Sequence, residues 1–373
     1  MTFALPRNAH IWLPGYLRAR VGRERPPQNG PIHVLFCVAD HYEPDHQSAS
    51  MDQELSRVAR WRTEYPRLFE RFRDADGRPP QHSFFFPAEM YRPEHLDSLA
   101  SLCADGFGEV EVHLHHHNDT SAGVREQLES FTTALVERHG LLSRFPDGRI
   151  AYAFIHGNWA LDNGGLDDSV CGVNDELTIL RETGCYADLT MPAVPDPAQS
   201  RIVNAIYYAQ DDPKAPRSYD TGVPIRVGGT PPPDSLLLIE GPLTVWWPRP
   251  IRSVMPRIDS GALDQSPGNR PSATRFARWV DANVTVVGRP EWVFVKVHTH
   301  GAPEFNADVL LGENNVEFHR RITQEFNDGT RYRLHYVTAR EMYNIAKAAE
   351  AGKSGDPAEY RDFEIRRVTQ TNR

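Results

Sequence analysis

The 373-residue sequence contains no run of apolar residues approaching the ~20 needed to span a bilayer. Residues 1–25 are interrupted by Pro6 and Pro14 and contain no continuous apolar stretch before a small-residue cleavage site, so they do not resemble a secretion signal. Only four cysteines are present and none forms a C-x-x-C pair, which argues against a disulfide framework and indicates buried free thiols. Together these absences predict a cytoplasmic protein with no membrane span.

An excess of positive charge is missing as well. The formal net charge is −9, and the Lys and Arg residues are not gathered into one block. Nucleic acids and anionic membranes both require a positive field on their protein partner, so the composition predicts no nucleic-acid partner. What the chain does have is material for a core, since 40% of its residues are hydrophobic and 10% are aromatic.

Short apolar runs alternate with stretches of helical spacing along most of the chain. Residues 32–38 form a continuous apolar run, which is typical of a strand buried on both faces. Further strands are expected at residues 83–86, 109–113, 151–156, 185–190, 292–298 and 332–337. Such alternation produces a parallel sheet with right-handed crossovers, and about seven strands favour an α/β fold closed into an irregular (β/α) barrel.

The pattern also predicts how the chain is divided. We expect an N-terminal extension over residues 1–30, the barrel domain over 31–350 and a C-terminal tail over 351–373. Within the domain the alternation fails between residues 192 and 290, where proline is dense. We interpret that stretch as an elaborated insertion carrying a few strands, and not as a separate domain.

Polar side chains suited to metal binding follow several of the predicted strands. In parallel barrels the reacting groups lie at the C-terminal ends of the strands. Those ends carry Asp40-His41, the run from His113 to His117, His156-Gly157-Asn158-Trp159, Asp188 and His298-Thr299-His300. Neutral imidazole and carboxylate are ligands that zinc-like ions prefer. The pattern therefore predicts a divalent metal, Zn²⁺ in first place, with Co²⁺, Ni²⁺ and Mn²⁺ as alternatives.

The spacing within residues 113–117 narrows the choice of ligands. If the strand continues past Val112, His113, His115 and His117 share one face, because side chains alternate along a strand. If a turn or helix begins after His113, then His113 and His117 share a face at i and i+4. Both possibilities bring His113 and His117 together, whereas the positions of His115 and His116 stay ambiguous.

Taken in order, several motifs resemble one known family, the metal-dependent polysaccharide deacetylases related to the nodulation chito-oligosaccharide deacetylase. The matching motifs are Val38-Ala39-Asp40-His41, where the family has paired aspartates, Ser83-Phe84-Phe85-Phe86-Pro87, the segment from Glu109 to His117 with its histidines four apart, and Val295-Lys296-Val297-His298. The histidine-pair motif is the specific one. The resemblance implies a barrel hydrolase that uses metal-activated water to remove an N- or O-acyl group, such as acetyl, from a sugar or polysaccharide-related substrate.

The resemblance also implies roles for individual residues. It makes Asp40 the catalytic base, His298 the general acid, and His41, His113 and His117 the metal ligands. Because only one aspartate is present, Asp40 is alternatively a metal ligand, with the base lost or supplied elsewhere, for example by Glu43. The remaining candidates are Asn158 and Trp159 as substrate-binding residues, and His115, His156, Asp188 and His300 as hydrogen-bonding supports or extra ligands.

Two other functions stay open. A His-rich barrel can also hydrolyse phosphoesters or other carbon–nitrogen bonds, which predicts two metals and extra ligands from His115, His116 and His300. The missing second aspartate is also consistent with a family remnant that binds a saccharide or another partner without catalysis.

Overall fold

The computed structural model describes residues 5–247 and 255–367, so the outermost parts of the predicted extension and tail lie outside it. Its strands are β1 (Ile32–His41), β2 (His82–Pro87), β3 (Gly108–Leu114), β4 (Ser143–Arg144), β5 (Ile150–His156), β6 (Cys185–Asp188), β7 (Ile206–Gln210), β8 (Val223–Pro224), β9 (Ser235–Ile239), β10 (Thr244–Trp246), β11 (Arg257–Asp259), β12 (Ala262–Leu263), β13 (Trp292–Thr299) and β14 (Tyr332–Tyr336). Its helices are α1 (Ala9–Gly22), α2 (Met51–Phe69), α3 (Pro93–Ala104), α4 (Ser121–His139), α5 (Glu176–Thr183), α6 (Ala273–Ala282), α7 (Glu304–Leu310), α8 (Glu313–Glu325) and α9 (Ala339–Glu350). Every strand expected from the apolar runs is confirmed.

The strands form one large, mostly parallel sheet, which confirms an α/β protein. The order is β12-β13-β1-β2-β3-β5-β6-β9-β7-β8, and the pairs from β12 to β9 are parallel. The first half of β1 also pairs in parallel with β14, while β7 pairs antiparallel with both β8 and β9. This order has two ends, so closure into a barrel stays a prediction. Among the described residues, no helix is long and apolar enough to cross a bilayer.

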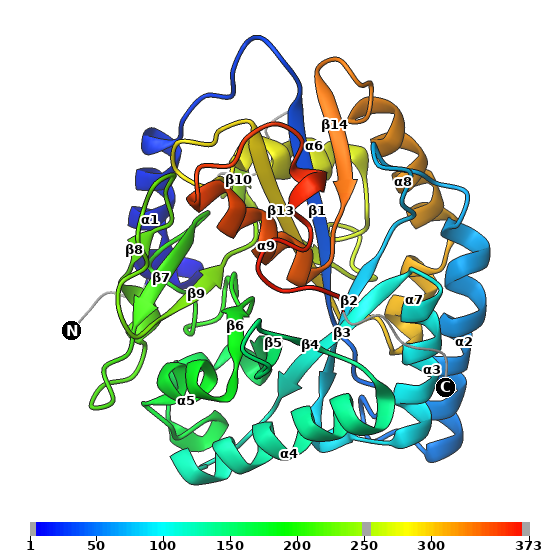
Figure 1. Cartoon of the computed structure of the whole chain (residues 1–373), viewed down its shortest axis with the longest axis vertical. Coiled ribbons are helices and arrows are strands. Elements are labelled where there is room, and N and C mark those ends of the chain that lie inside the picture. The colour runs from blue at the N-terminus through cyan, green and yellow to red at the C-terminus, as the bar shows by residue number, and fades with distance from the viewer. Residues whose placement is uncertain (1–4, 248–254, 368–373) are drawn as a thin grey trace.

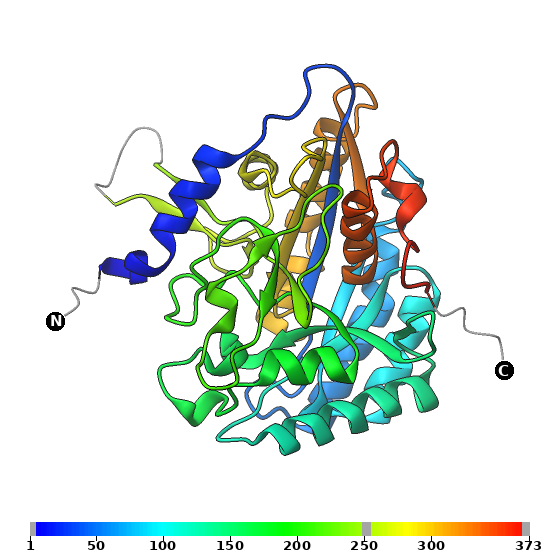
Figure 2. The ribbon, with the colours of Figure 1, turned by 60° about the vertical axis from the view of Figure 1, so that its left-hand side comes forward.

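The segments outside the regular alternation pack closely onto this sheet. The proline-rich stretch contributes β7, β8 and β9, so part of the expected insertion belongs to the sheet itself. The N-terminal helix α1 lies beside this stretch (Figure 2), where a Cβ on Gly15 would come 2.0 Å from the carbonyl oxygen of Arg201. Near the C-terminus the buried Arg361 pairs with Asp76 at 2.6 Å and with Glu341 at 2.7 Å.

Each face of the sheet is buried in its own hydrophobic core. Along β1, Val34, Phe36 and Val38 belong to the core shared with α2, α3, α4, α5, α6 and α8, which we call the helix-layer face. The alternate residues Leu35 and Cys37 belong, with Ala39, to the core shared with α9, which we call the α9 face. In Figure 1, α2 to α5 follow one another around the sheet and α9 lies across it.

The same alternation distributes the polar residues at the strand ends between the two faces. Asp40 follows Val38 on the helix-layer face, and His41 follows Ala39 on the α9 face, because successive side chains of a strand point to opposite faces. By the same parity His113 and His298 belong to the α9 face, since Val112 and Val297 lie in the helix-layer core. His156 belongs to the helix-layer face, since its neighbour Ile155 lies in the α9 core.

Candidate metal centre

One carboxylate and four imidazoles gather at the C-terminal edge of the parallel strands. Glu43 lies just beyond β1, and its Oε1 is 3.4 Å from His113 Nε2, 3.6 Å from His300 Nε2 and 3.8 Å from His115 Nε2. The ring of His41 lies beside them, with its centroid 4.7 Å from that of His300 and 5.0 Å from that of His113. We call Glu43, His41, His113, His115 and His300 the Glu43 cluster.

His113 has the geometry of a metal ligand. Its ring is fully buried, and Nδ1 donates to the carbonyl oxygen of Ile155 at 2.7 Å. This bond fixes the tautomer, so the lone pair of Nε2 faces Glu43. Among the described residues, no group satisfies hydrogen-bond geometry with that Nε2 atom. A buried acceptor in this situation fits a divalent cation.

The charges in the Glu43 cluster also suit a cation. Burial opposes ionisation of Glu43, but contacts with His113 and His46 outweigh it and lower the pKa of the carboxyl. Burial lowers the pKa of His41 and of His300. The cluster therefore offers one carboxylate and, in His41 and His300, neutral imidazoles, which are ligands that zinc and related ions prefer.

His115 differs from the other imidazoles of the cluster. Its Nδ1 donates to Glu89 Oε1 at 2.5 Å, from the short turn that follows β2. Burial opposes protonation, but Glu89 outweighs it and raises the pKa of His115. The ring also fills the space that a side chain on Gly157 would occupy, since a Cβ there would lie 2.1 Å from His115 Cδ2. His115 is thus a half-buried, protonatable group held at the rim of the cluster.

Asp40, the predicted base, faces away from the Glu43 cluster. Its fully buried carboxylate accepts the backbone N–H of Gly301 at 2.6 Å, and its other oxygen is 3.2 Å from His82 Nδ1. Trp61 Nε1 donates to the carbonyl oxygen of the same glycine at 2.9 Å. Asp40 therefore fixes the segment that carries His300. Both assignments left open by the sequence put Asp40 at the metal site, as base or as ligand, and this placement supports neither of them.

His117, the predicted partner of His113, is not brought to the cluster. It is exposed, and its Nδ1 lies 3.1 Å from the carbonyl oxygen of Ser169. The reason is local, because β3 ends at Leu114 and residues 115–118 form neither strand nor helix, so neither spacing rule applies to them. His115 takes the place beside His113 instead.

His298, the predicted acid, lies close to the cluster but is uncharged. Its ring centroid is 6.2 Å from that of His41. Burial, reinforced by Lys296 and His300, lowers the pKa of His298 to about 3. A neutral imidazole is a much weaker acid than an imidazolium, so this environment does not suit His298 to the role of general acid near neutral pH.

A hollow of about 480 Å³ opens beside the cluster. His298, His300 and Trp159 line it together with the proline-rich residues 192–197. Trp159 therefore lies where a bound substrate would contact it, while its neighbour Asn158 is exposed. A second hollow, of about 1250 Å³, lies near Ile32 and Tyr332 at the opposite strand ends, and none of the Glu43 cluster lines it.

His156 and Asp188, the other predicted supports, lie away from the Glu43 cluster. Asp188 accepts the hydroxyl of Thr190 at 2.7 Å, and that hydroxyl accepts the backbone N–H of His156 at 2.9 Å. The His156 ring belongs to a second polar group on the helix-layer face, together with His116.

No protein-family model and no curated protein matches the chain. The interpretation of the Glu43 cluster therefore rests on the geometry of its own residues. Two of them, Glu43 and His115, had only secondary places in the sequence analysis.

Proposed function

We propose that the protein is a metal-dependent hydrolase that removes an N- or O-linked acyl group, such as acetyl, from a sugar or polysaccharide-related substrate. The observation that carries the proposal is the convergence of His41, His113 and His300 on Glu43, beside a hollow lined by an aromatic side chain. Its position at the C-terminal edge of parallel strands also favours the finer interpretation of the sheet as an irregular (β/α) barrel.

Glu43, His41, His113 and His300 are the residues that would hold the ion. A divalent metal such as Zn²⁺ supplies Lewis acidity and lowers the pKa of water towards ~7. The protein contributes an ionised carboxylate, neutral rings and a ligand, His113, already oriented by Ile155.

His115 is the residue we assign to proton transfer. Glu89 holds its Nδ1, so Nε2 faces the Glu43 cluster and is able to take a proton from attacking water and return it to the leaving group. Its raised pKa suits work near neutral pH better than the lowered pKa of His298 does. Trp159 provides a face on which a sugar ring stacks.

One observation favours a second candidate function, the hydrolysis of phosphoesters or other carbon–nitrogen bonds with two metals. Donor atoms of His41, Glu43 and His300 lie within 4.8 Å of one another, and so do those of Glu43, His113 and His115. Glu43 belongs to both groups, and a carboxylate shared in this way is suited to bridging two cations.

The test compares wild type, Glu43→Gln and His117→Ala for metal content and for acetate release from acetylated amino sugars. We expect Glu43→Gln to lose metal and turnover, and His117→Ala to keep both. The second function would be favoured if wild type hydrolysed a phosphoester and Glu43→Gln lost about two ions per chain. A Glu43→Gln variant with unchanged metal content would contradict both functions, and metal without turnover of any such substrate would leave only binding.

A further inference from the structure

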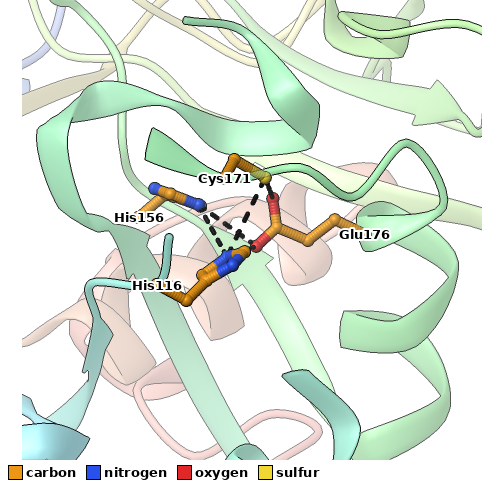
Figure 3. A group of neighbouring side chains, drawn as sticks. All are labelled: His116, His156, Cys171 and Glu176. Atoms are coloured by element: carbon orange, nitrogen blue, oxygen red, sulfur yellow. Dashed lines mark hydrogen bonds and ion pairs between the residues drawn. The ribbon is translucent and has the colours of Figure 1, made fainter. Parts of the chain in front are cut away.

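A second cluster of potential metal ligands lies on the helix-layer face, behind the Glu43 cluster. His116 comes from the segment after β3, His156 ends β5, Cys171 lies in the loop that follows, and Glu176 is the first residue of α5. Figure 3 shows these four side chains, the Cys171 cluster, pointing toward one another. All four are buried, with exposed fractions of 3% for His116 and 0% for the other three.

The donor atoms converge on one point. His116 Nε2 lies 2.8 Å from His156 Nε2, 3.0 Å from Glu176 Oε1 and 3.9 Å from Cys171 Sγ. Cys171 Sγ lies 3.9 Å from Glu176 Oε2, and His156 Nε2 lies 3.4 Å from Glu176 Oε1. A tetrahedral zinc ion with bonds of ~2.0–2.3 Å requires ligand atoms ~3.2–3.8 Å apart, and the observed separations bracket that range.

The remaining polar atoms of His156 and Glu176 are held by the protein, as they are around a bound metal, whereas His116 Nδ1 has no hydrogen-bond partner among the described residues. His156 Nδ1 lies 2.5 Å from the carbonyl oxygen of Gly157, and Glu176 Oε2 accepts the backbone N–H of Asp162 at 2.6 Å. Such outer contacts orient ligands toward an ion. Hydrogen bonding alone explains the group less well, because His116 Nε2 and His156 Nε2 face each other and share a single carboxylate oxygen.

The donor types of the cluster also suit a divalent cation. A thiolate at Cys171, a carboxylate at Glu176 and two neutral imidazoles would form a ligand set whose net charge matches one divalent ion. Sulfur and nitrogen ligands favour zinc over calcium or magnesium.

We propose that His116, His156, Cys171 and Glu176 bind a structural zinc ion, separate from the Glu43 cluster. All four ligands are buried and one of them is a cysteine sulfur, which is the arrangement of a structural zinc site. The ion links β5 and α5 to the segment after β3. It thereby holds His115, the neighbour of His116, and Gly157, the neighbour of His156, in the contact seen beside the Glu43 cluster.

The test uses Co²⁺ as a spectroscopic replacement for zinc. Full-length wild-type protein is stripped of metal and reloaded with Co²⁺, and the absorption spectrum is recorded. We expect a thiolate-to-cobalt charge-transfer band and the intense visible bands of tetrahedral cobalt. Cys171→Ser should lose the charge-transfer band and about one bound ion per chain. The matched control is Cys185→Ser, because Cys185 is also buried and donates to a carbonyl oxygen two residues ahead.

The outcomes separate this site from the proposed hydrolase. Glu43→Gln should keep the cobalt–thiolate band even where it loses turnover, so either proposal is able to fail alone. A wild-type spectrum without a thiolate band would overturn the structural site, and so would a band that persists in Cys171→Ser. The wild-type spectrum requires no substitution, so it decides the question if Cys171→Ser does not fold.

Discussion

Two histidine clusters lie at the same end of the sheet and differ in what surrounds them. In the Glu43 cluster, His115 and His300 are half-buried, every ligand is nitrogen or oxygen, and a hollow opens alongside. In the Cys171 cluster all four side chains are buried and one ligand is sulfur. The hollow beside the Glu43 cluster leaves room for a substrate, whereas the Cys171 cluster is enclosed by protein. This difference is the reason that we propose turnover at the first cluster and a structural role for the second.

The two clusters are separated at a single point of the backbone, between His115 and His116. His115 and His116 are adjacent, yet one faces Glu43 and the other faces Glu176. The segment that carries them is thus held from both sides of the sheet edge. A change in one cluster is expected to reach the other through this pair, with a smaller effect than a direct substitution has.

The largest expected effect separates His115 from His117. Replacing His115 with alanine removes the proposed proton carrier and should lower kcat/KM for acyl release by about 10²–10⁴-fold, with little change in metal content. His117→Ala removes an exposed ring outside both clusters and should change kcat/KM by less than about 3-fold. Steady-state kinetics measures kcat/KM for both variants. Equal losses of kcat/KM would refute the assignment of proton transfer to His115.

Metal removal should reveal the structural role of the Cys171 cluster. In the Glu43→Gln background the Cys171 cluster is the proposed metal site that remains intact. If zinc is present at 1,000 times its dissociation constant, its removal should reduce the free energy of unfolding by about 4 kcal/mol. Urea unfolding with zinc and with a chelator measures the difference. Identical curves would show that the Cys171 cluster adds nothing to stability.

Gly157→Ala tests how closely the two clusters are coupled. The added methyl group would lie 2.1 Å from His115 Cδ2, so the ring has to shift away from Glu89. We expect kcat/KM to fall by about 10–100-fold, as when the support of a site residue is lost. The cobalt–thiolate spectrum should stay unchanged. A normal rate would mean that the position of His115 has no bearing on turnover.

The smallest expected effect concerns Asp188, which supports the backbone of His156 through Thr190. Burial raises the pKa of Asp188 to about 7, against the hydrogen bonds from Thr190. The folded protein therefore holds a proton that the unfolded chain releases. The contribution of Asp188 to stability is complete below the unfolded pKa of 3.8 and is lost as the pH rises towards about 7.

The measurement for Asp188 is the slope of the free energy of unfolding against pH. Asp188 should contribute up to about −1.4 kcal/mol per pH unit to that slope between pH 4 and 7 in wild type, and this contribution should be absent in Asp188→Asn. Thr178→Ser serves as the control, because it keeps a hydroxyl residue on α5 and leaves Asp188 unchanged. A wild-type slope in Asp188→Asn would show that Asp188 titrates normally.

Much of the fold could be predicted because buried parallel strands are continuous apolar runs. β1, β13 and β14 were recognised in the sequence from their apolar residues. What the sequence could not show is long-range pairing, such as the insertion of β9 between β6 and β7, because nothing local encodes which strand lies beside another. Closure into a barrel is not predictable for the same reason, because it depends on which strands pair at the two ends of the sheet.

The candidate site was only partly predictable. His41, His113 and His300 were identified from strand ends, and the structure brings them together. The structure places Asp40 and His41 on opposite faces of the sheet, as the alternation from Val38 onward already indicates. The interpretation of His117 assumed regular structure after Leu114, where the chain is irregular.

The Cys171 cluster lay beyond sequence reasoning for a different reason. Its ligands come from four segments with no recurring spacing, and Cys171 sits in a loop without any pairing motif. The fold brings Glu176, the first residue of α5, to 3.4 Å from His156, the last residue of β5. Isolated histidines and a lone cysteine carry no signal until the fold assembles them.

The most direct test of the account is anomalous X-ray scattering at the zinc absorption edge from crystals of the wild-type protein grown with zinc. We predict density among Glu43, His41, His113 and His300, and separate density among His116, His156, Cys171 and Glu176. Absence of an anomalous peak beside Glu43 would contradict the central claim that this carboxylate and its histidines form a metal centre.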